Sequence, residues 1–211
     1  MNASLRRSDS STCTRRLPLQ RPARRVPFPA SIHLLSMLVV TVACRHEPQI
    51  AQAQDSASLQ VESASFTGGG DVPRRFTCDG AGISPGLDWS APPAGTRSQA
   101  IVMHDPDAAF DFTHWIAFNL PPGTRSLAEG ASAEGSMPQG ASEGANDFGH
   151  VGYGGPCPPG GRSHHYLFHL YALDVRLDLP PGASRKQLES AIRGHILAEG
   201  QLVGTYRRGG Q

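Results

Sequence analysis

Short apolar runs, each closed by Gly, Pro or Asp, recur along most of this chain and limit what it can fold into. The runs have the length and composition of β-strands and lie at residues 59–66, 98–104, 114–120, 165–173 and 201–206. With 24 Gly and 18 Pro among 211 residues, turns must be frequent and long helices few. The length suits one domain, predicted over residues 54–211. We therefore expect a mainly β fold of the β-sandwich type.

One peripheral helix is predicted near residues 184–199. Ser184 and Gln187 have the spacing of a capping box, and Gly200 can end the helix. Between them, apolar residues repeat on one helical face, namely Leu188, Ala191, Ile192 and Ile196. His195 lies on or beside that face, where a packed or hydrogen-bonded histidine is expected rather than a ligand. Residues 127–146 have almost no large apolar side chain and are predicted to form a long surface loop.

Residues 1–53 are predicted to be a basic N-terminal segment, a signal peptide and a linker. Seven arginines precede the apolar run 32–43, which is too short for an ordinary transmembrane helix and has the basic flank of a secretory signal. The alternative is a buried core helix, but the Arg-rich sequence before it and the Gln/Ser/Ala-rich sequence after it offer no packing partner. We therefore predict that the protein is exported.

Two processing sites are compatible with this signal. Ala51-Gln52-Ala53 has small residues where a signal peptidase needs them, whereas Val42-Ala43-Cys44 resembles a bacterial lipoprotein box with Thr41 in place of the usual Leu. Lipidation of Cys44 would make the protein an envelope-anchored lipoprotein, and cleavage after Ala53 would release it to the periplasm. No contact with the membrane is expected other than this anchor.

The charge distribution argues against nucleic-acid binding. Residues 1–43 carry seven arginines and a single acidic residue, Asp9, while the remainder has 12 basic and 17 acidic residues. A body of net negative charge lacks the electrostatic footprint that a phosphate backbone requires. Any anion must therefore be bound locally.

Two of the four cysteines, Cys78 and Cys157, lie in the predicted domain. An oxidising compartment would allow them to form a disulfide, although the sequence is equally compatible with two free thiols. No Cys-x-x-Cys spacing is present, so a zinc knuckle or a thioredoxin-like redox site is not expected. We predict no metal and no cofactor.

A group of polar residues is predicted where strands end. Alternation along a strand places His164 and Tyr166 on one face, and it groups His114 with Ile116 and Phe118. Both rows start polar and become apolar, which is expected where strands emerge from a core beneath a pocket mouth.

Asp105-Pro106-Asp107 directly follows another apolar strand, so two carboxylates lie at its end. Carboxylates beside histidines would keep the imidazolium form populated and give donors for phosphate or carboxylate oxygens. The glycine-rich segment 152–156 adds backbone that an anion can approach closely. The alternative is that Asp105 and Asp107 cap a turn and that the histidines belong to ordinary surface strands.

These residues resemble the phosphatidylethanolamine-binding protein family, especially its bacterial, Raf-kinase-inhibitor-like branch. Two signatures carry the resemblance, Asp105-Pro106-Asp107-Ala108 followed by His114-Trp115, and Gly155-Pro156 followed by His164-His165-Tyr166-Leu167-Phe168. Other stretches are also similar to that branch, at residues 76–80, 83–85, 146–149 and 202–206.

The resemblance implies two antiparallel sheets of Greek-key type, a few short peripheral helices and a small pocket for phosphate-like or carboxylate-like anions. The implied ligand-binding residues are Asp105, Asp107, Phe112, His114, Gly155, Pro156, His164 and Tyr166. Two positions depart from the family, which usually has Pro at residue 109 and Arg at residue 165. Ala109 leaves the pocket loop less constrained, and alternation places His165 on the face opposite to the pocket.

The expected function is noncatalytic binding of a small anion, such as phosphate, phosphoethanolamine or a carboxylate, with a possible inhibitory or regulatory role. A hydrolase using the same Asp and His side chains is the first alternative, although no Gly-x-Ser-x-Gly, His-Glu-x-x-His or phosphate-loop motif is present. A surface-acting inhibitor of a kinase or protease is the second, with no protein partner indicated.

Overall fold

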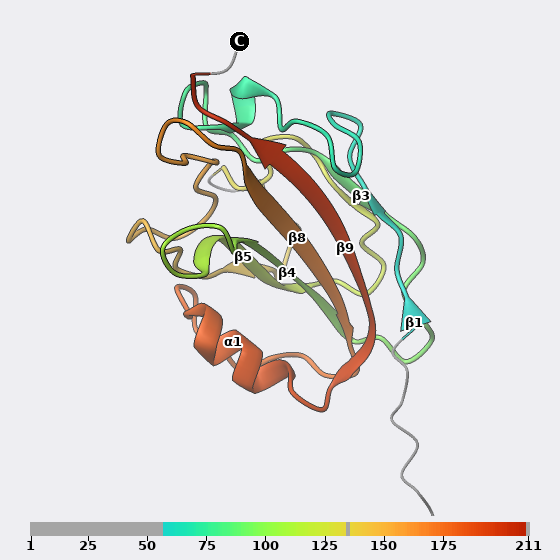
Figure 1. Cartoon of the computed structure of the whole chain (residues 1–211). Helices are drawn as coiled ribbons and strands as arrows, with labels where there is room; N and C mark the ends of the chain where they lie inside the picture. The colour runs from blue at the N-terminus through green and yellow to red at the C-terminus, as the bar shows by residue number, and fades with distance from the viewer. Residues whose placement is uncertain (1–56, 134–135, 210–211) are drawn as a thin grey trace, which may run out of the picture. The chain divides into compact units, whose positions relative to one another are not determined.

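The computed structural model describes residues 57–133 and 136–209, so the predicted signal peptide, Cys44 and both processing sites lie outside the described residues. Two sheets form the body of the domain, and one α-helix lies beside the larger sheet (Figure 1). The strands are β1 (Ala57–Ser58), β2 (Val61–Glu62), β3 (Leu87–Trp89), β4 (Ser98–Asp105), β5 (Phe112–Leu120), β6 (Ser126–Leu127), β7 (Ser142–Glu143), β8 (His164–Leu173) and β9 (Ile196–Tyr206). The helices are the 3-10 turn η1 (Arg74–Phe76) and α1 (Arg185–Ile192).

The larger sheet has six strands in the order β1-β9-β8-β4-β5-β7, and all of its pairs are antiparallel except β1 with β9. The smaller sheet is antiparallel, with the order β2-β3-β6. The four long strands β4, β5, β8 and β9 lie side by side and form the centre of the larger sheet. This arrangement confirms the predicted mainly β class with two sheets.

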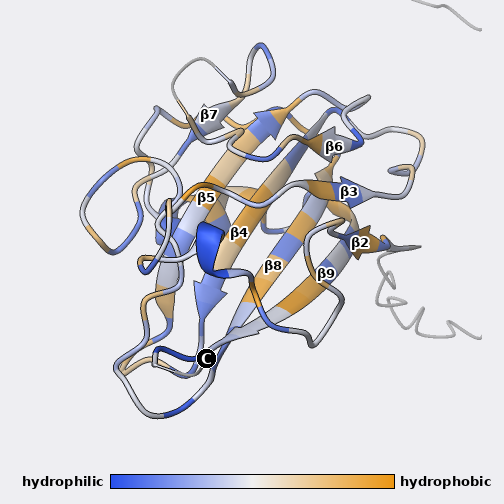
Figure 2. Cartoon of the chain, turned by 90° about the horizontal axis from the view of Figure 1, so that it is seen from above, coloured by the Kyte–Doolittle hydropathy of each residue, from blue (hydrophilic) through white to orange (hydrophobic). Residues whose placement is uncertain are grey.

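Apolar side chains pack on both faces of the large sheet, in line with the mixed hydropathy of its strands (Figure 2). The inner core lies on the face shared with the small sheet and contains Trp115, Tyr166 and Phe168. The outer core lies on the face covered by α1 and contains Phe118 and Leu188. Because both faces of its central strands are covered, β4 is buried along its whole length, and its end is fixed in position.

The predicted helix is present but ends early. Ser184 and Gln187 form the expected capping box, and Leu188 is buried. The prediction of a helix to residue 199 was wrong, because the chain leaves the helix at Arg193 and Gly194 takes a left-handed φ of 81°. Gly200 does not end a helix; it lies within β9, where a Cβ would come 2.2 Å from the carbonyl oxygen of Leu59.

The short strands were not predicted from the sequence. β3, β6 and β7 have three residues or fewer, and the predicted strand at 59–66 contains only the two residues of β2. The region 127–146 is largely irregular as predicted, apart from the start at Leu127 and the strand β7. Across the described ranges, no helix is long and apolar enough to cross a membrane.

Candidate functional site

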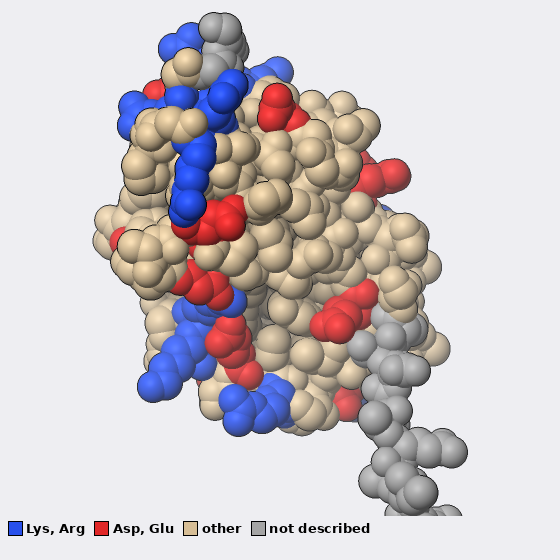
Figure 3. All heavy atoms as spheres, viewed as in Figure 1, with Lys and Arg blue, Asp and Glu red and all other residues tan. Residues whose placement is uncertain are grey.

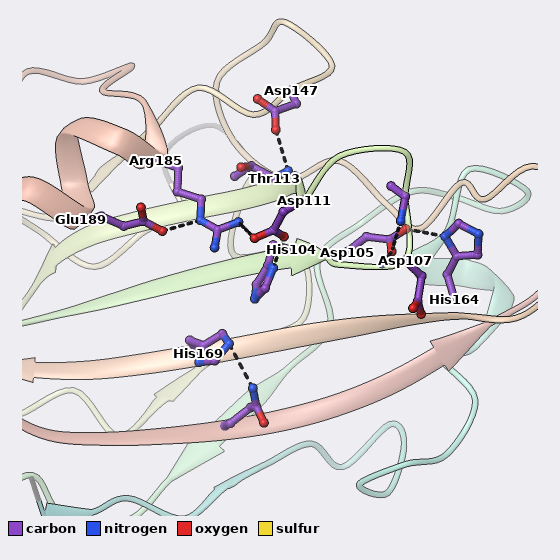
Figure 4. A network of polar contacts seen from close by, with 12 residues as sticks. His104, Asp105, Asp107, Asp111, Thr113, Asp147, His164, His169, Arg185 and Glu189 are labelled. Carbon is purple, nitrogen blue, oxygen red and sulfur yellow. Dashed lines mark hydrogen bonds and ion pairs between the residues drawn. The ribbon is translucent and has the colours of Figure 1, made fainter. Parts of the chain in front are cut away.

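The first part of the site is a buried carboxylate–imidazole pair, Asp105 and His164. Antiparallel pairing brings the end of β4 beside the start of β8, so residues 59 positions apart meet (Figure 4). Asp105 Oδ2 accepts a hydrogen bond from His164 Nδ1 at 2.8 Å, and both side chains are almost fully buried. Asp105 Oδ1 accepts the backbone N–H groups of Asp107 and Ala108 at 2.8 and 3.1 Å. The turn-capping alternative is thus correct for Asp105, which also orients His164 and leaves its Nε2 for a ligand.

His114 enters the site through a β-bulge. Met103 pairs with Trp115 and His104 pairs with Thr113, so His114 is the extra residue between two paired ones. The bulge breaks strict alternation, and the predicted grouping of His114 with Ile116 and Phe118 was therefore wrong. Those two side chains pack in the outer core under α1, whereas the His114 ring lies edge-on to Tyr166 with centroids 5.1 Å apart.

The protonation expected for His114 also needs correction. Its Nδ1 donates to the carbonyl oxygen of Gly154 at 2.7 Å, which leaves Nε2 as the second ring position. Burial lowers the pKa of His114, and the Gly154 carbonyl and the Asp105 charge oppose this shift without reversing it. Near neutral pH this ring is therefore neutral, whereas nearby carboxylates were expected to keep it charged.

Tyr166 carries a buried hydroxyl without a partner. The side chain is fully buried, and its hydroxyl makes no hydrogen bond of acceptable geometry with any described residue. Burial, followed by the charge of Asp105 and the approach of the hydroxyl to that carboxylate, raises the pKa of Tyr166, so the hydroxyl stays protonated. A buried polar group is normally paired, because leaving it unpaired costs roughly 1–3 kcal/mol.

Asp107 does not join the buried group. Its Oδ2 accepts the backbone N–H of His165 at 2.8 Å and the ring Nδ1 of His165 at 2.7 Å, and these hydrogen bonds lower the pKa of Asp107. Both side chains are well exposed, at 36% for Asp107 and 56% for His165. Alternation correctly placed His165 on the outer face, but the residue still acts on the site because it fixes the carboxylate beside the mouth.

An aromatic cluster that includes Phe112 lies beside His114. The Phe112 ring lies 5.2 Å from the His114 ring and 4.8 Å from the Phe148 ring, centroid to centroid. Phe148 was not predicted as a site residue, although it lies in one of the family-like stretches. The centroid of its ring lies 5.3 Å from that of His114. The only sequence signal for Phe148 was an aromatic residue within a predicted loop-rich region.

Gly155 and Pro156, the edge that the resemblance implied, directly follow Gly154, whose carbonyl oxygen accepts a hydrogen bond from His114. A Cβ on Gly155 would come 2.5 Å from the carbonyl oxygen of Phe76, so only glycine fits this close approach. Pro156 O accepts the backbone N–H of Cys78 at 3.1 Å, and Cys78 is joined to Cys157 by a disulfide. The structure thus forms the bond that the sequence left open, and it anchors this edge.

A cavity opens next to the buried group. Its lining is formed by Asp107, Ala108, Ala109, Pro159, Gly160, Arg162 and His164. His164 belongs to both the cavity wall and the buried group, so it joins the solvent-accessible mouth to the polar groups beneath. Ala109, where the family usually has Pro, lies in this lining. Within the described parts of the chain, no three His, Cys, Asp or Glu side chains are arranged to hold a metal ion.

A second polar network was not predicted at all. Arg185 at the start of α1 pairs with Glu189 and with Asp111, and Asp111 pairs in turn with His104 of β4 (Figure 4). The His104 ring stacks on His169 of β8, with ring centroids 5.1 Å apart. This chain of contacts ties α1 to the loop between β4 and β5. No local motif signals it, because its members come from four separate segments.

Fold and site together define a two-sheet β protein with a buried Asp–His–Tyr group at the end of the central strands. The family model described as phosphatidylethanolamine-binding protein matches residues 62–207, and the chain belongs to this family. A UPF0098 protein of Methanothermobacter thermautotrophicus is 46% identical over 152 residues, which cover 72% of this chain and 100% of that protein. A protein of Mycobacterium tuberculosis named as a candidate lipoprotein, LppC, is 42% identical over 150 residues, covering 70% and 72%.

Solved structures agree with this assignment. Escherichia coli YbcL, described as a member of the mammalian family, superposes with a TM-score of 0.68 at 31% identity, covering 72% of this chain and 99% of YbcL. A homologue from Chlamydia trachomatis gives a TM-score of 0.65 at 37% identity with the same coverage. The predicted family and fold class are therefore confirmed.

Proposed function

We propose that this protein is an exported, noncatalytic binding protein whose pocket takes one small anionic group, such as phosphate, phosphoethanolamine or a carboxylate. The observation that carries the proposal is the orphan hydroxyl of Tyr166, buried beside His114 and Asp105. A ligand oxygen would supply the hydrogen-bond acceptor that this hydroxyl lacks.

The local charges are compatible with an anion. Both oxygens of Asp105 accept hydrogen bonds from within the protein, three in all. The carboxylate therefore orients the neighbouring groups and does not present a free negative charge to an incoming anion. Its pairing with His164 Nδ1 orients that ring and leaves Nε2 as the ring atom that can contact a ligand. Entry of an anion would also favour protonation of the neutral His114, so that binding takes up protons.

The partners of the two histidines favour binding over catalysis. Neither ring hydrogen-bonds to a hydroxyl or thiol of a described residue; their partners are a carboxylate and a backbone carbonyl. Nucleophilic catalysis needs a nucleophile within hydrogen-bond reach of its base. The family name and the lipoprotein name of one relative support a binding protein of the cell envelope.

Isothermal titration with phosphate and with phosphoethanolamine tests the ligand. The parent should release or absorb heat with a defined stoichiometry, and His164→Ala should abolish it. His195→Ala is the matched control, since His195 Nδ1 also pairs with a carboxylate at 2.8 Å but at an exposed position. Absence of heat from the parent, or equal heat from His164→Ala, would refute the proposal.

Export has a separate test. The intact mass of the protein recovered from an envelope fraction distinguishes cleavage after Ala53 from a lipidated Cys44. Recovery of an unprocessed chain from the cytoplasm would contradict both forms.

A further inference from the structure

A second solvent-accessible feature lies beside the pocket mouth and is lined by arginines. One cavity is lined by Arg74, Asp79, Gly160, Tyr206, Arg207, Arg208 and Gly209. A neighbouring cavity shares several of these residues and adds Asp71, Val72, Pro73, Gly161, Arg162 and Ser163. Basic side chains gather at this end of the molecule, where β9 ends and the C-terminus emerges (Figure 3). We call this feature the arginine groove and define it by Arg74, Arg162, Arg207 and Arg208.

The groove continues into the pocket mouth. Gly160 lines both the mouth cavity and the first groove cavity, and Arg162 lines both the mouth cavity and the second. A Cβ on Gly160 would meet no atom within 4 Å, so the wall is open there. A ligand in the groove can therefore lie next to one in the pocket, with Gly160 and Arg162 at the boundary between them.

One wall of the groove is organised by Asp79. Its carboxylate accepts the hydroxyl of Tyr206 at 2.7 Å and pairs with Arg208 at 3.1 Å, while its backbone oxygen accepts Arg74 Nε at 2.8 Å. Asp79 directly follows Cys78, and the other wall begins three residues after Cys157. The disulfide therefore connects the two walls. Asp79 thus contacts three of the residues that line this wall.

The groove has an excess of positive charge. Among the described residues, Arg208 alone of the four arginines forms an ion pair, with Asp79. Arg74 and Arg162 donate only to backbone oxygens, which are neutral, so their positive charges are not balanced. Arg162 donates one amino group to the carbonyl oxygen of Asp107 at 3.1 Å, which leaves most of its guanidinium donors available. A planar guanidinium group can bind two oxygens of one phosphate at once. Several arginines together therefore favour a ligand that carries more than one phosphate group.

We propose that the arginine groove is a second binding site, for phosphate groups, that acts independently of the buried pocket. The shared chemistry is a phosphate presented next to the pocket mouth, either by a soluble oligophosphate or by the surface of an anionic lipid membrane. This inference does not rest on the proposed function of the pocket, because no residue that defines the groove belongs to the Asp105–His114–His164–Tyr166 group.

The test titrates the full chain with tripolyphosphate at low salt. In the double variant Arg162→Gln/Arg207→Gln we expect the Kd to rise at least about tenfold, the loss expected from removing charged hydrogen bonds. Arg176→Gln is the matched control, since Arg176 is likewise exposed and donates to a backbone oxygen, that of Gly140 at 2.8 Å. It should bind as the parent does, and thermal melting checks that all variants fold.

A His164→Ala variant separates the two sites. Tripolyphosphate binding that survives in His164→Ala but is weakened in the arginine double variant supports the groove, even if the pocket proposal fails. Sedimentation with phosphatidylglycerol vesicles, against phosphatidylcholine vesicles, identifies the source: loss of vesicle binding in the double variant assigns membrane phosphate, and loss of tripolyphosphate binding alone assigns a soluble ligand. Equal affinities of the parent and the double variant in both assays would overturn the inference.

Discussion

Asp105 and His164 form a 2.8 Å hydrogen-bonded pair in which both side chains are about 4% exposed. A second pair of the same kind and distance, Asp174 with His195, is about half exposed. The two pairs therefore separate the effect of burial from the effect of geometry. Only the buried pair joins two neighbouring strands of the central sheet and caps the loop that follows β4.

Asp105→Asn should lower the free energy of unfolding by about 2–4 kcal/mol, because it replaces a buried carboxylate that accepts three hydrogen bonds with a group that is partly a donor. Asp174→Asn should cost less than about 1 kcal/mol, as expected for an exposed pair. Urea unfolding followed by circular dichroism measures both values. Similar losses in the two variants would show that burial is not what makes Asp105 important.

Tyr166→Phe should have opposite effects on stability and on binding. Removing an unpaired buried hydroxyl should raise the free energy of unfolding of the ligand-free protein by about 1 kcal/mol. If the pocket binds an anion as proposed, the same change should weaken that binding about tenfold, because a hydrogen bond is lost. Tyr171→Phe, on the other face of β8, is the control for both measurements. A less stable Tyr166→Phe protein would mean that the hydroxyl is already satisfied.

Stability should fall as the pH is lowered from about 6.5 to about 4. Burial, followed by the neighbouring His104, lowers the pKa of His169 from 6.5 to about 4, and burial also lowers that of His114. Between the ordinary and the lowered pKa, the unfolded chain binds more protons than the folded one, so acid favours unfolding. Carboxylates with a lowered pKa, such as Asp107, lose their contribution only below their ordinary value of 3.8. The pH range in which the histidines destabilise the protein therefore lies above the range in which the carboxylates do so.

His169→Gln should remove about 1–2 kcal/mol of this loss between pH 6.5 and 4, after allowing for the partial exposure of the ring. Urea unfolding at half-unit pH intervals gives the two curves. Parallel curves for parent and variant would show that His169 does not contribute.

The sequence predicted the parts of the site that depend on regular strands. His164, Tyr166 and Phe168 alternate inward along β8 as expected, and His165 lies outward. Prediction failed at His114, because one extra residue in β5 reverses the faces that follow it, and a bulge leaves no mark in residue type. Asp107 lies in the lining of the mouth cavity, but its pairing with His165, 58 residues away along the chain, was not predicted. Alternation cannot detect a contact that crosses from one strand end to the next.

The protonation of the site was unpredictable for a related reason. Nearby carboxylates raise the pKa of a histidine and burial lowers it, so the outcome depends on depth, which the sequence does not contain. At His114 burial has the larger effect. The network of Arg185, Asp111 and His104 was missed because helix, loop and strand meet only after the sheet has formed.

The disulfide should contribute strongly to stability. It closes a sequence separation of 79 residues, for which loop entropy predicts about 4 kcal/mol. The double variant Cys78→Ser/Cys157→Ser should lose this amount in urea unfolding, and the parent treated with a reductant should match it. A loss below about 1 kcal/mol in both would indicate that the hydrogen bond between Cys78 and Pro156 already holds the edge.

Gly155→Ala should destabilise the protein by about 1–3 kcal/mol through steric overlap. The added Cβ would come 2.5 Å from the carbonyl oxygen of Phe76 and 2.9 Å from Cα of Thr77, and both are backbone atoms that a rotamer change cannot move. Gly123→Ala is the control, because its Cβ would meet no atom within 4 Å, and it should change stability by less than about 0.5 kcal/mol. If Gly155→Ala is as stable as the control, segment 154–157 must move away from Phe76. Such a movement would also displace the Gly154 carbonyl that orients His114, so anion titration of the same variant would detect it.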